Sequence, residues 1–585
     1  MIYTSVLKKN WVLKQYDTKL VEKYCEKYSF DELTSRLLVI KKIEENNFVN
    51  FLNPTIKNTM PSPYSLIDME KAVKKIFGAI LNKQKIGIFG DYDVDGASSS
   101  ALLGKFFNHI NHPYEIFIPD RVSDGYGPTI KSFDKLINKG IKAIITVDCG
   151  VGSFEAVEYA NQKKVDVVIL DHHQCEIILP KANAIVNPNR IDCTSNLNYL
   201  CAAGVTFLFL VALNGYLVKR TFFKNSNIKS LNLINYLDLV CLGTICDVVP
   251  LIKFNRSIVK QGLQVIKQRK NTGIRTLYDL IKINQSPNAH HIAFQIGPRI
   301  NAGGRVGKSS YGSKLLLAEN HENALKISSQ LNVYNSQRQI LQEKLFQDVE
   351  KEAEKLISSP VLILSGRDWH QGVIGIVASK IKDKFQKPTV LISLNGDKGK
   401  GSARSVYGFD IGTAFLSALK LGLIENGGGH KMAGGFSINK SKINLFKNFL
   451  FNQFNKSKGV SFANNNTYID GKISSSALNE DFFNKINILA PYGAGNSEPI
   501  FLIENIKVVK AIPVGKNHLR VIFISKNNVT FNTIAFNCVG TELGSYLSTG
   551  NKKMISIIGK ISLNEWRGRR NIEFIIEDIS VIKTQ

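Results

Sequence analysis

Carboxylates gather at one point early in the chain. The segment GDYDVDG places Asp91, Asp93 and Asp95 directly after a short apolar stretch, Lys85 to Phe89. Carboxylates this close to one another repel and need cations to neutralise them. Hard oxygen ligands suit Mg²⁺ or Mn²⁺. The segment therefore predicts a site for divalent metal ions.

A calcium-binding EF-hand loop begins with the same D-x-D-x-D-G pattern, so it is the first alternative to weigh. The last ligand of such a loop is a bidentate Glu, whereas Leu102 stands at that position here. The preceding stretch is also typical of a strand, while an EF-hand loop follows a helix. Both observations argue against calcium.

Two more apolar stretches end in Asp. Asp148 follows IKAIITV, and Asp171, His172 and His173 follow VDVVIL. The carboxyl ends of parallel strands are where open α/β sheets bind ligands. One such Asp alone is most simply explained as a helix cap, but three together, one followed by two histidines, favour a metal site. Asp247, in LGTICDVVPL, lies where a helix is expected to end and could supply another ligand.

This set of residues favours one kind of chemistry. Carboxylates with one or two imidazoles suit a pair of divalent ions, which activates a water and stabilises the leaving oxygen of a phosphoester. The sequence contains no GxSxG motif and no Walker P-loop. Cys149 and Cys175 are better explained by packing. Because no CxxC pair occurs, we expect the eight cysteines to be reduced thiols.

The elements that would position these residues alternate between strands and helices. Strands are expected at Lys85 to Phe89, Tyr114 to Ile118, Ile141 to Val147 and Val165 to Leu170, with helices at Ser98 to Asn108 and Ser153 to Lys163. This alternation predicts βαβ units and a parallel sheet. Further helices are expected at 202–218, 231–245 and, as one long stretch, 312–357.

A second α/β module and a β-rich domain follow. The module ends in the glycine cluster GGGHKMAGG, and the short strands beyond the linker at 455–467 predict a small β-barrel or sandwich. The expected domains are a helical N-terminal segment (1–65), an α/β domain (66–255), a helical connector (256–357), a second α/β domain (358–456) and a β-barrel domain (465–585).

Charge adds one indication about partners. The chain has 585 residues, a net charge of +27 and a pI near 9.5. A field this positive favours a polyanion such as nucleic acid, although drift in an AT-rich genome also raises the pI. No apolar run reaches the roughly 18 residues of a membrane span, and none at the N-terminus suits a secretory signal. We therefore expect a cytoplasmic protein with no membrane partner.

The motifs together resemble a known family. GDYDVDG, VDCG, DHH, GTICDVVP and GGGHKMAGG are similar to the DHH phosphoesterase superfamily with its DHHA1 partner domain. GPRINAGGR (297–305), GSARS (401–405) and PYGAGNSEP (491–499) resemble, more closely, the RecJ family of single-strand-specific exonucleases. The resemblance covers about residues 70–585. It implies two α/β modules, a DHH parallel sheet and DHHA1, joined by a long helix and followed by an OB-like β-barrel.

The resemblance also implies an activity. RecJ-like enzymes hydrolyse single-stranded DNA from the 5′ end, release 5′-mononucleotides, need Mn²⁺ or Mg²⁺, and act in DNA repair and recombination. We accordingly expect a monomeric metal-dependent exonuclease with two divalent ions as cofactors. Its expected partners are single-stranded DNA, a RecQ-type helicase and single-strand-binding protein.

The resemblance also implies site residues, which are assigned to this chain motif by motif. The implied metal ligands are Asp91, Asp93, Asp95, Asp148, His172 and Asp247, with Asp148 bridging. His173 is expected to face the scissile phosphate and Asp171 to orient the histidines. One position departs from the pattern. Many DHH phosphoesterases have His four residues before the first ligand Asp, where this chain has Phe89. Asp91 or water is expected to take that ligand's place.

Substrate contacts are expected on both modules. Arg121, Ser402 and Arg404 match the family's 5′-phosphate pocket, and an Arg fork suits phosphate. Further contacts are expected from Arg299, Asn301 and Arg305 in GPRINAGGR, from Gly428, Gly429 and His430, and from Trp566 and Arg567 in the barrel. Surface charges, turns and a basic hairpin are the simpler explanations of these residues.

Two other functions stay open at this point. One is a DHH phosphodiesterase for smaller substrates, such as nanoRNA or cyclic dinucleotides, against which the extra barrel and the charge of +27 argue. The other is a DNA-binding relative that has lost its metal ligands. The dense acidic set argues against that second function.

Overall fold

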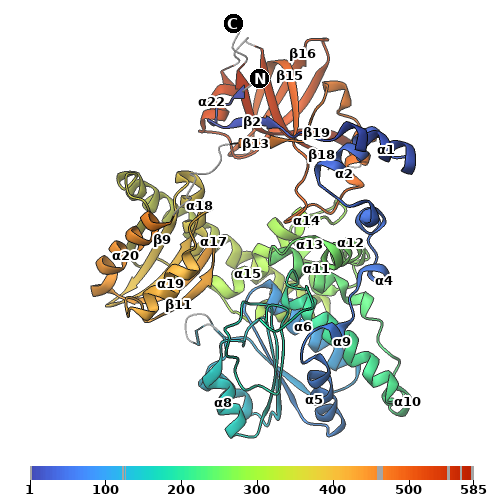
Figure 1. The fold of residues 1–585 in the computed structure, drawn as a ribbon, viewed down its shortest axis with the longest axis vertical. Coiled ribbons are helices and arrows are strands. Elements are labelled where there is room, and N and C mark those ends of the chain that lie inside the picture. The colour runs from blue at the N-terminus through green and yellow to red at the C-terminus, as the bar shows by residue number, and fades with distance from the viewer. Residues whose placement is uncertain are drawn as a thin grey trace.

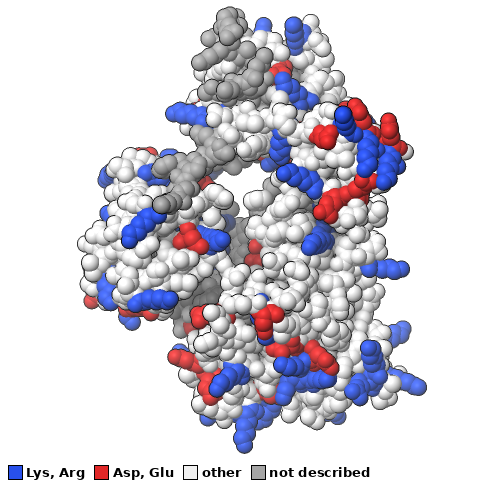
Figure 2. Space-filling model, in the orientation of Figure 1, with Lys and Arg blue, Asp and Glu red and all other residues white. Residues whose placement is uncertain are grey.

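Three bodies surround an opening through the molecule (Figures 1 and 2). The computed structural model describes residues 3–120, 124–125, 127–457, 466–549, 554–566 and 569–581. A parallel α/β body lies at the bottom of Figure 1, a smaller α/β body at the left and a β-barrel at the top, with helices connecting them. On the face in Figure 2, Lys and Arg are spread over all three bodies and do not form one patch.

The first body is built on a parallel sheet of order β4-β3-β5-β6-β7. Neighbouring residues of its strands face different cores: Ile88 packs with α5, α6 and α9, whereas Phe89 packs with α7 and α8. Both faces are thus covered, which explains the continuous apolar runs. The strands are β3 (Ile86–Gly90), β4 (Tyr114–Phe117), β5 (Ala143–Val147), β6 (Asp166–Leu170) and β7 (Ala184–Val186). The helices are α5 (Met69–Leu81), α6 (Val94–His109), α7 (Ile130–Ile137), α8 (Phe154–Gln162) and α9 (Ala202–Lys219).

Helix α9 is long and apolar enough to cross a membrane, alone among the helices in the described parts of the chain. About two thirds of it, 67%, is buried inside the protein, against α5, α6 and α11 (Leu237–Cys246). Its apolar sequence is therefore accounted for by the core of the first body.

Helices connect the two α/β bodies. They are α11 (Leu237–Cys246), α12 (Lys253–Lys267), α13 (Thr272–Leu280), α14 (Ala289–His291), η4 (Ile292–Ile296), α15 (Gly297–Val306), α16 (Tyr311–Leu317) and α17 (His321–Lys355). The single stretch expected at 312–357 is divided, because Ala318 is extended and Asn320 caps α17 by accepting a hydrogen bond from the backbone N–H of Asn323.

The second body has a mixed sheet of order β11-β12-β10-β9-β8, in which only β8 and β9 are parallel. Helix α18 packs with α17 on one face, and α19 and α20 pack on the other. The elements are β8 (Leu362–Arg367), α18 (Gln371–Phe385), β9 (Thr389–Asn395), β10 (Lys398–Arg404), α19 (Ile411–Lys420), β11 (Asn426–His430), β12 (Ala433–Asn439) and α20 (Ile443–Lys456).

The C-terminal body is a closed barrel of five strands. The strand order is β15-β16-β17-β19-β18, and pairing of β15 with β18 closes it. The strands are β15 (Phe501–Val514), β16 (His518–Ser525), β17 (Thr530–Ala535), β18 (Ile555–Trp566) and β19 (Arg569–Val581), accompanied by α21 (Glu480–Asn487) and α22 (Glu542–Ser548). The expected architecture of two α/β modules and an OB-like barrel is confirmed.

The N-terminal segment differs from the expected helical segment. Strands β1 (Tyr3–Thr4) and β2 (Asn10–Leu13) form a sheet with β13 (Asn466–Ile469), because Trp11 and Leu13 pack with Ile469 and Leu502 beside the barrel. The helices that follow, α1 (Thr18–Tyr28), α2 (Glu32–Ile40) and α3 (Phe48–Leu52), share the barrel's core. The start of the chain therefore packs with its end.

Candidate metal centre

Three neighbouring strands end at the candidate metal centre. Gly90 pairs with Val147, and Val147 pairs with Leu170, so the residues that follow these strands meet at one edge of the sheet. Asp91, Asp148 and Asp171 are those residues, and all three are buried. The convergence expected from the strand ends is therefore present.

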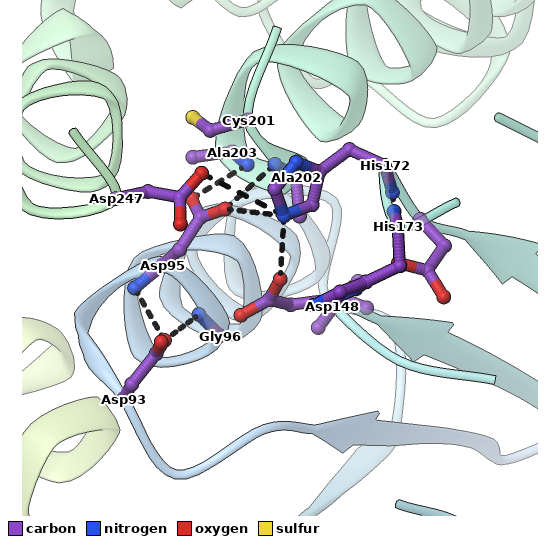
Figure 3. Close-up of polar contacts among 12 residues, drawn as sticks. Asp93, Asp95, Gly96, Asp148, His172, His173, Cys201, Ala202, Ala203 and Asp247 are labelled. Atoms are coloured by element: carbon purple, nitrogen blue, oxygen red, sulfur yellow. Dashed lines mark hydrogen bonds and ion pairs between the residues drawn. The ribbon is translucent and has the colours of Figure 1, made fainter. Parts of the chain in front are cut away.

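The first motif turns directly into helix α6. Asp93 caps the helix by accepting hydrogen bonds from the backbone N–H groups of Asp95 (2.9 Å) and Gly96 (3.1 Å). Asp95 points instead at the start of α9, where its two oxygens accept from the N–H groups of Ala202 (2.6 Å) and Ala203 (2.9 Å) (Figure 3). A helix N-terminus favours negative charge, so α9 holds the buried Asp95 carboxylate in place.

His172 lies at the middle of the carboxylates (Figure 3). Its Nε2 is 3.2 Å from Asp148 Oδ1, 3.7 Å from Asp247 Oδ2 and 3.9 Å from Asp95 Oδ2. Asp247 reaches this point because it terminates α11. Burial lowers the pKa of His172, which favours the neutral imidazole that binds metals.

His173 is held by Asp171. Oδ1 of Asp171 accepts from Nδ1 of His173 at 2.8 Å and from the backbone N–H of His172 at 2.8 Å. Burial disfavours both charges, but this contact raises the pKa of His173 to about 9 and holds the pKa of Asp171 at about 2. The His173 ring stacks on His430 of the second body, with centroids 6.2 Å apart and planes at 14°.

The side chains form overlapping groups whose ligand atoms lie within 4.8 Å of one another. The groups are Asp91, Asp93 and Asp148; Asp148, His172 and His173; and Asp95, His172 and Asp247. Asp148 belongs to the first two, and its contact with His172 connects them to the third.

The raised pKa values of its carboxyl groups indicate that this centre needs cations. Burial, and then the neighbouring carboxylates, raises the pKa of Asp148 well above its ordinary value, and the pKa of Asp247 to about 9. Burial also raises the pKa of Asp95. Divalent ions would relieve this repulsion, and oxygen ligands with an imidazole suit Mn²⁺ or Mg²⁺. The residues therefore fit such ions.

Phe89 does not contribute a side chain to the centre. Its ring is fully buried on the other face of the sheet, 5.5 Å from the Phe117 ring and 5.8 Å from the Phe133 ring. Asp91, by contrast, lies with Asp93 and Asp148. Asp91, one of the two replacements expected for the missing His ligand, therefore lies close enough to Asp93 and Asp148 to share a metal ion with them.

A cleft of about 1760 Å³ lies between the connecting helices and the barrel. Cys246, the neighbour of Asp247 in the chain, and Asn301 line it on the connector, and Arg520 and Lys560 line it on the barrel. Phe294 also lines it, is 69% exposed, and has its ring 4.8 Å from that of His290. Sequence reasoning missed this aromatic pair, since nothing in AHHIAF marks it as exposed.

Comparison with known proteins agrees with this arrangement. The DHH family, N-terminal domain, matches residues 85–244, the DHHA1 domain matches 357–456 and the RecJ OB domain matches 469–578. Over 540 residues the chain is 32% identical to the single-stranded-DNA-specific exonuclease RecJ of Escherichia coli (strain K12), covering 90% of this chain and 92% of that protein. The chain belongs to the RecJ family.

Other RecJ proteins are similar along most of the chain. RecJ of Bacillus subtilis (strain 168) is 28% identical, covering 99% of this chain and 72% of that protein. The crystal structure of RecJ in complex with Mn²⁺ from Thermus thermophilus shares the fold, with a TM-score of 0.78, 24% identity, and 98% and 80% of the two chains covered. A crystal structure of exonuclease RecJ bound to manganese is 28% identical, with a TM-score of 0.57, over 68% of this chain and 98% of that one.

The RecJ motif GPRINAGGR, from which substrate contacts are expected, forms helix α15. Asn301 Oδ1 accepts from the backbone N–H of Val94 (3.1 Å), and Arg299 donates to Asn332 Oδ1 (2.9 Å). Arg305 donates to the carbonyl of Gly372 on α18 (3.2 Å). A Cβ on Gly304 would lie 2.7 Å from the carbonyl oxygen of Tyr92. Gly304 thus lets α15 approach the loop between Asp91 and Asp93, while Asn301 and Arg305 connect α15 to the first and the second body.

The RecJ glycine cluster is a β-hairpin made of β11 and β12. Gly428 and Gly429 lie in its first strand, and His430 at the end of that strand reaches the metal centre. Ser402 and Arg404 lie on the adjacent β10, where Arg404 donates to Ser402 Oγ at 3.4 Å. Ser402 and Arg404 are thus one strand away from the second strand of the hairpin, with Ser402 opposite Gly435 and Arg404 opposite Ala433.

Three of the expected substrate contacts remain. Arg121 and Arg567 lie outside the described residues, and Trp566 is the last residue of β18. Sequence reasoning also missed Gly243, in the motif that ends in Asp247. A Cβ there would lie 2.4 Å from Asp95 Oδ1. The glycine one helical turn before Asp247 was the available signal.

Proposed function

We propose that this protein degrades single-stranded DNA from the 5′ end, releasing 5′-mononucleotides through two metal ions, in DNA repair and recombination. As a member of the RecJ family it is a metal-dependent nuclease, with Mn²⁺ or Mg²⁺ as cofactor. The observation that carries the finer proposal is the joining of two ligand groups by Asp148 under the His430 hairpin. The domain limits expected for the first α/β domain (66–255), the connector (256–357), the second α/β domain (358–456) and the barrel domain (465–585) are kept as part of the proposal.

The ions would be held by the overlapping groups. Asp91 and Asp93 would hold one ion, Asp95, His172 and Asp247 the other, and Asp148 would contact both. When bound, two such ions activate a water and stabilise the leaving oxygen of a phosphodiester. The helix termini at Asp93 and Asp95 keep these carboxylates oriented, which limits the reorganisation that binding requires.

His173 is the proposed phosphate-facing residue. Asp171 keeps Nδ1 of the ring occupied and favours its protonated form. A protonated ring beside the carboxylates offers Nε2–H to a phosphate oxygen, whose charge it partly neutralises. His430, stacked on His173, closes the site from the second body.

The 5′ end is proposed to stop at the second body. Ser402 and Arg404 lie on the strand next to the His430 hairpin, which supports their proposed binding of a terminal phosphate. Arg121 belongs to this proposal through the family motif alone. The rest of the strand would follow the cleft toward the barrel, where Phe294 and His290 offer a surface on which bases stack.

The proposal includes the cellular setting expected from the sequence. A cytoplasmic, monomeric enzyme working with a RecQ-type helicase and single-strand-binding protein would meet the substrate that these proteins expose. Co-purification from cells, with and without nuclease treatment, tests that part.

Polarity is the decisive test of the function. Strands of about 40 nucleotides, labelled at the 5′ or the 3′ end, are digested with Mn²⁺ beside a blunt duplex of the same sequence. We expect the 5′ label to appear first, as a mononucleotide, and the duplex to resist. Earlier release of the 3′ label, or equal attack on the duplex, would refute the proposal.

A further inference from the structure

An arginine is buried where the connecting helix α12 meets the barrel body. Arg256, in the first turn of α12, is 1% exposed, and its guanidinium lies 3.9 Å from the centre of the Phe51 ring. It donates to four main-chain carbonyls, those of Phe51 (2.7 Å), Leu489 (2.7 Å), Ala490 (2.9 Å) and Pro491 (3.2 Å). A guanidinium in this position orders the segments that surround it, because its fork has a fixed geometry.

Three of these carbonyls lead into the motif PYGAGNSEP, which the nuclease site leaves unexplained. The motif turns back on itself through mutual backbone hydrogen bonds between Gly493 and Asn496. Asn496 Nδ2 donates to the same Leu489 and Pro491 carbonyls, at 2.9 Å each. The segment is therefore folded around the carbonyls that Arg256 binds.

The motif also lies directly on the first body. The backbone N–H of Leu251 donates to the Ala494 carbonyl at 2.7 Å. A Cβ on Gly493 would lie 2.7 Å from the Leu251 side chain, and one on Gly495 would lie 3.1 Å from Pro250. The two glycines permit this close approach.

The fourth carbonyl belongs to the N-terminal segment. Phe51 lies in α3, and Lys260, one turn after Arg256, donates to the neighbouring Leu52 carbonyl at 2.5 Å. Helix α3 packs in the barrel's core through Phe48. Arg256 thus binds two segments of the barrel body, helix α3 and residues 489–491.

We propose that Arg256 and residues 489–497, here called the interdomain latch, fix the barrel at the distance from the helical connector that lets one DNA strand pass. Residues 490–494 of the latch line the cleft between the connector and the barrel, together with Leu251 and Lys260 beside the latch. Arg256 is accordingly a positioning residue for strand selection. This inference rests on the proposed function.

The test uses the full chain. R256M keeps most of the side chain's volume and removes its donors, R256K keeps the charge, and K267M is the control at an exposed residue of α12. Activity is measured on a dinucleotide, a 40-nucleotide strand and a duplex. For R256M we expect dinucleotide kcat/KM within twofold of wild type, KM for the long strand raised at least tenfold with kcat within threefold, and increased attack on duplex. R256K should recover part of this change, and K267M should match wild type.

Two results would overturn the latch. One is an unchanged long-strand KM in folded R256M, and the other is an equal loss on dinucleotide and long strand. If R256M does not fold, G493A weakens the same contact from the barrel side and is judged by the same criteria. Failure of the proposed function itself would be seen separately, as a wild-type protein without activity on single strands.

Discussion

Three features of Asp148 each cost free energy of folding. It has a left-handed backbone (φ 62°), it is buried, and it faces four other carboxylates; burial, and then these carboxylates, raise its pKa. Asn tolerates the left-handed region, so D148N keeps the backbone and removes the charge. We expect Mn²⁺-dependent turnover to fall on the order of 10³-fold, while melting temperature in a chelator rises. D348N, on the exposed face of α17, is the control. Near-normal turnover in D148N would exclude Asp148 as a shared ligand.

The same cluster makes metal-free stability depend on pH. A carboxyl with a raised pKa binds more protons in the folded state, so stability falls as pH rises between its ordinary pKa, near 4, and its raised value, about 9 for Asp247. The raised pKa of His173, about 9, acts in the same direction. Metal binding displaces these protons. The rise in melting temperature caused by Mn²⁺ should therefore grow between pH 5.5 and 8.5; a constant or shrinking rise would contradict the electrostatic account.

Arg404 tests the proposed 5′-phosphate pocket. A charge-assisted hydrogen bond contributes about 1.5–3 kcal/mol, roughly tenfold to a hundredfold in a binding constant. R404A should lower kcat/KM on 5′-phosphorylated strands by that factor, and much less on 5′-hydroxyl strands. Equal losses on both substrates would make Arg404 a general backbone contact or a structural residue.

Sequence reasoning brought together the strand-end carboxylates and histidines, because parallel strands must end at one edge. It could not predict that Asn301 accepts a hydrogen bond from the backbone N–H of Val94, because that contact joins residues far apart in the chain. It interpreted the glycines of GPRINAGGR as letting the backbone approach a ligand, and in the structure Gly304 lets helix α15 approach the backbone of Tyr92. Composition alone does not distinguish these two uses of glycine.

At the scale of elements, the β11–β12 hairpin carries His430 to the centre. Gly429 has φ 158°, and a Cβ there would lie 2.3 Å from the Ala433 carbonyl oxygen, so G429A must distort the hairpin. A displacement of about 1 Å costs roughly 10²-fold in rate, and we expect kcat to fall tenfold to a hundredfold. G435A is the matched control on β12, because its Cβ would meet only Gly401 O at 3.6 Å. Equal activities of G429A and G435A would remove the hairpin from the active site.

For the whole molecule, the order of the bodies was predictable from the sequence. The pairing of the N-terminal strands with the C-terminal domain was not. Strand β2 pairs with β13 through residues such as Asn10 and Asn466, and local sequence carries no sign of so distant a partner. Tyr24, Leu37 and Phe48 share the barrel's core for the same reason. Apolar residues in the first 50 positions indicate that this segment is packed, but they do not indicate which surface it packs against.

This pairing determines how the barrel can be removed. A chain of residues 1–457 would expose the apolar face of α1–α3, where each uncovered large side chain costs about 1.5–3 kcal/mol, and we expect it to aggregate. Residues 54–457 should remain monomeric and hydrolyse dinucleotides. They should bind long strands more weakly and with a flatter salt dependence, because fewer phosphates are neutralised. Light scattering and binding at several salt concentrations check this. An unchanged salt slope would separate the barrel from DNA binding.

The central claim is a pair of ions sharing Asp148, and anomalous diffraction from crystals soaked in Mn²⁺ measures it most directly. The account predicts two anomalous peaks at the strand ends. One should contact Asp91 and Asp93, the other Asp95, His172 and Asp247, and both should contact Asp148. A single peak, or two peaks without Asp148 between them, would contradict it.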